Sequence, residues 1–145
     1  VGAWAAPVVV LAAAVPAAAA SVNPASLGSV TAPIQGKQAS FVVPITNSGA
    51  ASITVKVELL PEKKTNGTWG AIQTPPWNGN HTGVQTEAVP AGATVSFQNL
   101  GKLKLDTDAT PAGTVCRVRI AVTLVEQTSF PTFYGYSPEF TAPAR

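Results

Sequence analysis

The chain has 145 residues, a length that fits one domain with its own hydrophobic core. Only 11% of the residues are charged and the net charge is +2. Because capture of a nucleic acid backbone needs clustered cations, these values exclude nucleic acid as the partner. A single cysteine, Cys116, excludes an intrachain disulfide, and with the single histidine, His81, it excludes a zinc site built from such ligands. We therefore expect no metal and no cofactor.

Residues 1–21 carry no charge and consist mainly of alanine and valine. Pro16 ends the apolar run, and small residues follow it up to Ser21. A short apolar stretch followed by small residues is the pattern that signal peptidase recognises. We therefore expect residues 1–21 to be an export signal, cut near Ala20, and residues 22–145 to be one β-sandwich domain. Membrane contact is then expected only through residues 1–20, during export.

The same segment carries a resemblance. Its sequence, GAWAAPVVVLAAAVPAAAAS over residues 2–21, resembles the second half of export signals from high-GC Gram-positive bacteria of the actinobacterial type. In those signals a Gly-Ala-Trp core with a following proline precedes an alanine-rich cleavage site. The resemblance implies an extracellular or cell-surface location, and it leaves the Sec and twin-arginine export routes both open.

Short β-rich runs separated by turn residues make up the rest of the chain. In residues 52–60 and 114–126 apolar and polar side chains alternate, which is the period of a half-buried strand. The pattern predicts an antiparallel β-sandwich. Its core strands are expected at residues 39–46, 52–60, 93–100 and 114–126, with further strands near 29–34, 68–73, 84–88 and 132–141.

Two residues in these strands have specific expectations. Proline cannot donate a backbone hydrogen bond, so Pro44 predicts that residues 39–46 lie at a sheet edge or contain a bulge. Cys116 falls on the apolar face of residues 114–126, opposite to Arg117 and Arg119. Its thiol is therefore expected to be buried with Val118, Ile120 and Val122 between the sheets, and to be unreactive.

A second resemblance involves two turn motifs. Residues 43–49 (VPITNSG) precede the alternating strand at 52–60, and residues 89–95 (VPAGATV) precede the strand at 114–126. This arrangement resembles the immunoglobulin-like modules of bacterial surface proteins, including CARDB-type adhesion modules, over residues 30–126. The resemblance implies an all-β, immunoglobulin-like sandwich that binds or spaces, with no catalytic role.

Candidate catalytic and metal-binding residues are few. His81 lies in a Gly- and Asn-rich loop, and the chain has no Gly-x-Ser-x-Gly motif to supply a nucleophile. Asp106 and Asp108 fall in a turn that lacks the oxygen ligands of a calcium loop. We therefore expect no enzyme activity.

The aromatic residues of the turns are the candidate binding residues. Trp69 and Trp77 belong to the loop at residues 66–82, where few apolar neighbours are expected. They either cap one end of the sandwich or form a platform for a protein or glycan partner at the cell surface, because aromatic rings anchor interfaces and stack on sugars. Tyr134 and Tyr136 have the same two interpretations.

A second interpretation retains residues 1–20 in the mature protein. An apolar N-terminal helix before a β-sandwich resembles the archaeal-type pilins, and this resemblance implies self-assembly into an extracellular filament. The expected filament-core residues are Trp4, Val8, Leu11 and Val15. However, the run contains one leucine and no isoleucine or phenylalanine, so it offers little apolar area for helix bundling. Cleavage of the segment is therefore the preferred interpretation.

Overall fold

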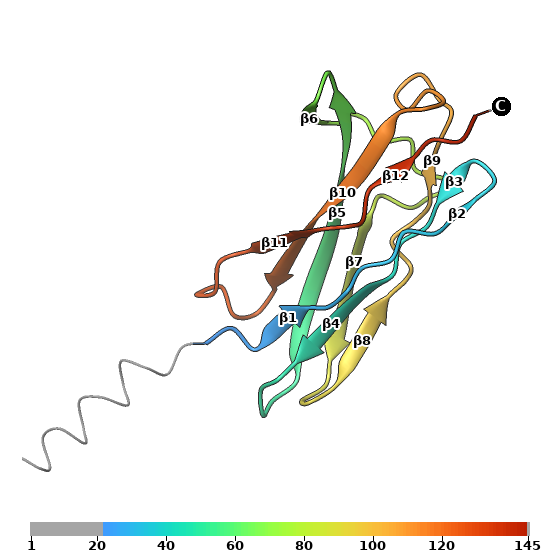
Figure 1. The fold of residues 1–145 in the computed structure, drawn as a ribbon. Coiled ribbons are helices and arrows are strands. Elements are labelled where there is room, and N and C mark those ends of the chain that lie inside the picture. Colours follow the sequence, from blue (N-terminus) through green and yellow to red (C-terminus); the bar gives the residue numbers. More distant parts are fainter. Residues whose placement is uncertain (1–21, 145) are drawn as a thin grey trace, which may run out of the picture.

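A computed structural model describes residues 22–144, which form an all-β, immunoglobulin-like sandwich of antiparallel strands (Figure 1). The predicted fold class is confirmed. The residues expected to form a filament core, Trp4, Val8, Leu11 and Val15, lie outside the described residues. Within the described part, no helix is long and apolar enough to cross a membrane.

The larger sheet is built on two long strands, β5 (Ile53–Thr65) and β10 (Val115–Leu124). They pair from Val55 with Leu124 to Lys63 with Cys116. The other edge of β10 pairs with β11 (Phe133–Tyr136) and β12 (Phe140–Thr141). The other edge of β5 pairs with β7 (Val84–Val89) and β6 (Thr68–Ala71).

A second sheet of three strands covers the larger one. Its order is β1 (Ala25–Leu27), β4 (Val43–Asn47) and β8 (Thr94–Phe97). A small third sheet at one end contains β2 (Ile34–Gln35), β3 (Gln38–Ala39) and β9 (Leu103–Lys104). The turn between β7 and β8 carries the chain from the larger sheet to the second, which closes one side of the sandwich.

Pro44 lies in the central strand of the second sheet, so the expectation of an edge position is wrong. The alternative expectation, a bulge, describes the pairing. Leu27 pairs with Ile45, and Thr31 pairs with Val42. The chain therefore advances four residues from Leu27 to Thr31 but only three between Ile45 and Val42, which leaves one extra residue in the segment that follows β1. The Pro44 carbonyl accepts a hydrogen bond from the Gly28 amide at 2.9 Å, and the register slips beside it, so the ladder does not need an amide from Pro44.

The core follows from the period-two alternation of the sequence. From Ile53 to Pro61 every second residue of β5 is buried, and so is the inner face of β10. The second sheet contributes its own inner face, and removal of this apolar surface from water is the main stabilising term. The largest fully buried side chains are Phe41, Phe97, Ile45, Leu100, Leu103, Ile120, Val43, Val55, Val57, Val89, Val118 and Val122.

The buried polar side chain of Asn47 joins the two sheets. Its amide nitrogen donates to the carbonyl of Ala51 at 2.8 Å and to the carbonyl of Val89, in β7, at 3.0 Å. Its amide oxygen accepts a hydrogen bond from the Gly49 amide at 2.9 Å. Asn47 is completely buried, and these bonds satisfy both ends of its side chain.

Cys116 is buried in the core with Val118, Ile120 and Val122, as predicted. Burial raises the pKa of its thiol from the ordinary value of 9.0 to about 11, although the nearby ammonium of Lys63 opposes the rise. The folded state therefore favours the neutral thiol over the thiolate.

This shift predicts a pH-dependent loss of stability. The thiol of the unfolded chain ionises at a lower pH than the buried thiol does. The free energy of unfolding is therefore unaffected by this group below pH 9 and falls as the pH rises from 9 towards 11. We expect the protein to lose roughly 2–3 kcal/mol more than a Cys116→Ala variant over this interval. Urea denaturation of both proteins at several pH values measures the difference. Parallel pH profiles would contradict the assignment of the shift to this thiol.

Candidate binding surface

The outer face of the larger sheet carries aromatic and guanidinium side chains in alternation. Arg117 and Arg119 point outward from β10 because their neighbours on that strand, Cys116 and Val118, point into the core. Antiparallel pairing places Tyr136 opposite Arg119 and Tyr134 opposite Ala121. Trp69 reaches the same face from β6, where it is paired with Lys64.

These side chains stack on one another. The guanidinium carbon of Arg117 lies 4.2 Å from the ring centroid of Trp69 and 4.0 Å from that of Tyr136. The guanidinium carbon of Arg119 lies 3.8 Å from the ring centroid of Tyr134. Each contact contributes about 0.5–1 kcal/mol at an exposed site and restricts both partners. We call Trp69, Arg117, Tyr136, Arg119 and Tyr134 the aromatic–arginine ladder.

The two arginines of the ladder differ in their electrostatic partners. Arg117 donates from Nε to Oε1 of Glu62 at 2.7 Å, and this ion pair fixes its guanidinium between the rings. Arg119 has no carboxylate partner within residues 22–144, and its Nε is buried without a hydrogen-bond acceptor. The ladder therefore presents one guanidinium whose charge the described part of the chain does not neutralise.

The ladder is accessible to a partner. Tyr134 and Tyr136 are 49% and 50% exposed, the Trp69 ring is partly exposed, and Ala121 is buried beneath them. Tyrosine, tryptophan and arginine are the residues that most often dominate binding energy at protein interfaces. Since stacking already fixes these side chains, little conformational entropy remains to be lost on binding.

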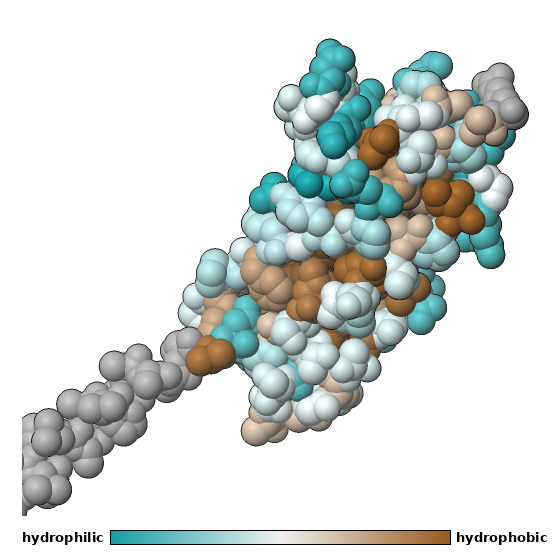
Figure 2. Space-filling view, viewed as in Figure 1, coloured by the Kyte–Doolittle hydropathy of each residue, from teal (hydrophilic) through white to brown (hydrophobic). Residues whose placement is uncertain are grey.

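An apolar groove continues from Tyr134 along the open side of the sandwich. It has a volume of about 570 Å³ and runs between β1 and β11, with Leu27, Pro131 and Phe133 among its lining residues. Figure 2 shows hydrophobic residues gathered in a band across the middle of this side. β1 and β11 pass so close that a Cβ atom at Gly135 would overlap Cδ2 of Leu27. The groove and the ladder therefore form one continuous surface.

Trp77 does not belong to this surface. Its ring meets that of Phe41 edge-on, with centroids 6.3 Å apart, and packs against the hydrophobic core. Gly83, at a φ of +78°, passes so close that a Cβ atom there would lie 2.5 Å from Cζ2 of Trp77. The structure thus separates the two tryptophans of the loop at residues 66–82. Trp77 occupies the position expected of a cap.

The two tryptophans should differ in their effect on stability. Trp77→Ala leaves a cavity beside the core and should lower the free energy of unfolding by about 2–4 kcal/mol. Trp69→Ala removes only stacking on an exposed face and should cost about 1 kcal/mol or less. Urea denaturation measures both values. Equal losses in the two variants would contradict the separation of cap from platform.

The other candidate residues are dispersed. Asp106 forms an ion pair with Lys37, with 3.0 Å between Oδ2 and Nζ, and Asp108 lies in the turn that follows. His81 lies in the exposed loop before β7. Within residues 22–144, no three His, Cys, Asp or Glu side chains come close enough together to hold a metal ion.

Sequence reasoning missed the two arginines as site residues. It used Arg117 and Arg119 only to place the thiol of Cys116 on the opposite face. A signal was present, because Arg117-x-Arg119 and Tyr134-x-Tyr136 each repeat at the two-residue period of one strand face. What the sequence did not reveal is that β11 pairs with β10 in the register that brings these faces together.

Comparison with known proteins identifies a similar fold and no family. No protein-family model and no curated protein matches the chain. A FixG-related protein from Vibrio parahaemolyticus has a TM-score of 0.53 at 15% identity, over 83% of this chain and 97% of that one. The E. coli curli protein CsgC has a TM-score of 0.39 at 13% identity, over 81% and 99% of the two chains. A protein from Archaeoglobus fulgidus has a TM-score of 0.41 at 18% identity, over 83% and 100%. The first similarity establishes a shared fold alone.

Proposed function

We propose that this protein is an exported, non-enzymatic module of the cell surface that binds a partner protein through the aromatic–arginine ladder. The observation that carries the proposal is the interleaving of three aromatic rings with two guanidinium groups at 3.8–4.2 Å on one exposed sheet face. The export step rests on the sequence of residues 1–21. Export to the cell surface agrees with the adhesion role that is implied by the resemblance to bacterial surface modules.

The geometry favours a protein partner over a glycan. Sugars bind to aromatic side chains by stacking on a free ring face. In the ladder, guanidinium groups already cover one face of Tyr134 and one face of Tyr136. A protein can instead use the ring edges and the tyrosine hydroxyl groups, and its apolar side chains fit the groove beside Tyr134.

The charge of the ladder specifies part of the partner's surface. Glu62 neutralises Arg117, whereas Arg119 has no carboxylate within the described residues. A complementary partner therefore carries an acidic side chain opposite Arg119 and apolar side chains opposite the groove. Such complementarity mainly increases association rate and specificity.

Site-specific photo-crosslinking on intact source cells tests the proposal. A photoreactive phenylalanine analogue replaces Tyr134 in one variant and Ser96 in the other. Ser96 is exposed on β8, in the opposite sheet, and serves as the matched control. We expect a protein adduct from position 134 and none from position 96, and we expect protease added to intact cells to degrade the chain.

Two results would overturn the proposal. Equal adducts from both positions would indicate random collisions, and a chain protected from protease would place it inside the cell. Arg119→Gln provides a further check, because it removes the unpaired charge without removing an ion pair within the described chain. That variant should reduce the adduct from position 134 by about tenfold, a change of about 1.4 kcal/mol in binding.

A further inference from the structure

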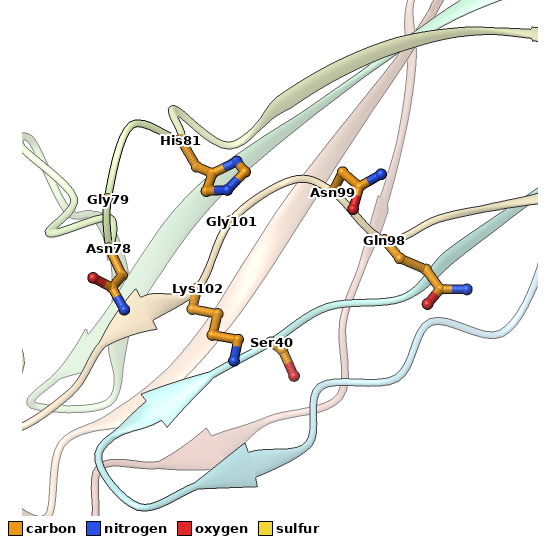
Figure 3. Close-up of a pocket in the computed structure, with 8 residues that line it drawn as sticks. All are labelled: Ser40, Asn78, Gly79, His81, Gln98, Asn99, Gly101 and Lys102. Carbon is orange, nitrogen blue, oxygen red and sulfur yellow. The ribbon is translucent and has the colours of Figure 1, made fainter.

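A polar hollow lies at the end of the sandwich near β9, separate from the ladder. It has a volume of about 400 Å³, within the range of small-molecule sites. Its walls come from the loop before β7 and from residues 98–102, which precede β9 (Figure 3). The polar side chains that line it are those of Ser40, Asn78, His81, Gln98, Asn99 and Lys102.

Backbone hydrogen bonds hold the two walls together. The Asn78 amide donates to the carbonyl of Lys102 at 2.8 Å, and the Gly83 amide donates to the carbonyl of Leu100 at 2.9 Å. Trp77 forms a β-bridge with Leu103 and anchors the same loop to the core. The hollow is therefore preformed, so ligand binding does not have to order the loop.

A glycine keeps the hollow open. Gly101 has a φ of +111°, and a Cβ atom there would lie 2.5 Å from Cβ of His81 and 3.5 Å from Cε3 of Trp77. Any side chain at this position would collide with the opposite wall. The absence of a side chain on Gly101 thus lets its backbone pack directly against His81, close to the Trp77 ring.

Among the polar side chains that line the hollow, that of Ser40 donates a hydrogen bond to the carbonyl of Pro33 at 3.5 Å, and the other five are available to a ligand. Within the described residues, the side chains of Asn78, Gln98, Asn99, His81 and Lys102 make no hydrogen bond or ion pair. Each amide offers both donors and an acceptor, and Lys102 offers a positive charge. No carboxylate lines the hollow. Figure 3 shows Lys102 extending towards Ser40, with Asn78 and His81 on the wall that faces it.

We infer that this hollow binds a uronic acid, with the carboxylate on the ammonium of Lys102 and the hydroxyl groups on the amides of Asn78 and Asn99. A ring of hydroxyl groups matches side chains that both donate and accept, and a single carboxylate matches a single cation without a competing acid. The inference is independent of the proposed function, because none of these residues belongs to the ladder. The uronic acid is either a free monosaccharide or a unit of a polysaccharide.

Titrations of the isotope-labelled protein, followed by two-dimensional NMR, test this inference. The probes are D-galacturonate, D-galactose, trigalacturonate and acetate. We expect galacturonate to shift the amide signals of Asn78, Asn99 and Lys102 and to leave the Tyr136 signal in place. Galactose should bind at least about tenfold more weakly because it lacks the carboxylate. Tighter binding of the trimer than of the monomer identifies a polysaccharide as the source, and equal binding identifies the free acid.

Matched lysine variants make the test specific. Lys102→Gln should weaken galacturonate binding about tenfold or more and leave galactose binding unchanged. Lys56→Gln, at an exposed position of β5, should alter neither. Three results would overturn the inference: no shifts at about 50 mM probe, which corresponds to negligible affinity; acetate as effective as galacturonate; or equal effects of the two lysine variants.

Discussion

Replacing Cys116 with aspartate should remove much of the folding stability at pH 7. The side chain at this position is completely buried in the hydrophobic core, to which both sheets contribute residues. A carboxylate there loses its hydration, and the ammonium of Lys63 is already directed to the carbonyl of Ala109 at 3.2 Å. An incompletely compensated buried charge costs about 3–5 kcal/mol. Since a domain is stable by only about 5–15 kcal/mol, the variant should be close to unfolding.

Measurements at low pH separate the effect of the introduced charge on the stability of the Cys116→Asp variant from the effect of its altered side-chain shape. Burial raises the pKa of the introduced carboxyl, so the variant is most stable below the ordinary value of about 3.9 and loses stability as the pH rises. The difference from the natural protein, measured by urea denaturation at each pH, should therefore shrink between pH 7 and pH 4. A Cys116→Val variant should show a small difference at both values. A constant deficit for the aspartate variant would mean that packing, not charge, is responsible.

The sequence predicted the core because a half-buried strand has a period of two. The alternation in residues 52–60 and 114–126 identified which side chains of β5 and β10 are buried, and it placed Cys116 correctly. These assignments depend only on local order along the chain, so they need no knowledge of which strands pair. The fold class followed from the number and spacing of such runs.

The candidate surface was only partly predictable because it depends on pairing. Trp69, Tyr134 and Tyr136 were candidates from their residue type alone, but Trp69 was grouped with Trp77, its neighbour in the sequence. The pairing of β6 with β5 and of β11 with β10 instead brings Trp69 next to Arg117, whose guanidinium also stacks on Tyr136. Register between strands distant in the chain is a property of the whole fold, and no local pattern reports it.

The position of Pro44 is a second case in which a local pattern does not report the pairing of strands. A proline lacks one donor, which disfavours a central position, yet β4 is central. The register slip lies in the partner segment between Leu27 and Thr31, where the only sequence sign of a bulge is Gly28. The missing amide donor of Pro44 is a local property that the sequence shows. The register slip that accommodates it lies in the neighbouring segment of the sheet.

Replacing Asn47 with leucine should destabilise the fold by about 3–5 kcal/mol, although the new side chain has a similar size. The variant loses the donors to Ala51 and Val89 and the acceptor for the amide of Gly49. The site is completely buried, so water cannot replace these partners. Each unsatisfied group costs about 1–3 kcal/mol, which exceeds the gain from an added apolar side chain. Urea denaturation measures the loss.

Two further variants isolate the contribution of the amide group. Asn47→Asp keeps an acceptor for Gly49 but places a carboxylate against the carbonyls of Ala51 and Val89, so at pH 7 it should be at least as damaging as leucine. Ser48→Ala removes only an exposed hydrogen bond to Pro24, 3.2 Å long, and should cost less than about 1 kcal/mol. If Asn47→Leu were no worse than Ser48→Ala, the turn would be held by its backbone bonds to Gly92 and Ala93. If instead Asn47→Leu loses several kcal/mol of unfolding free energy, the hydrogen bonds of the Asn47 side chain connect β4 to β7 and so link the two sheets of the sandwich.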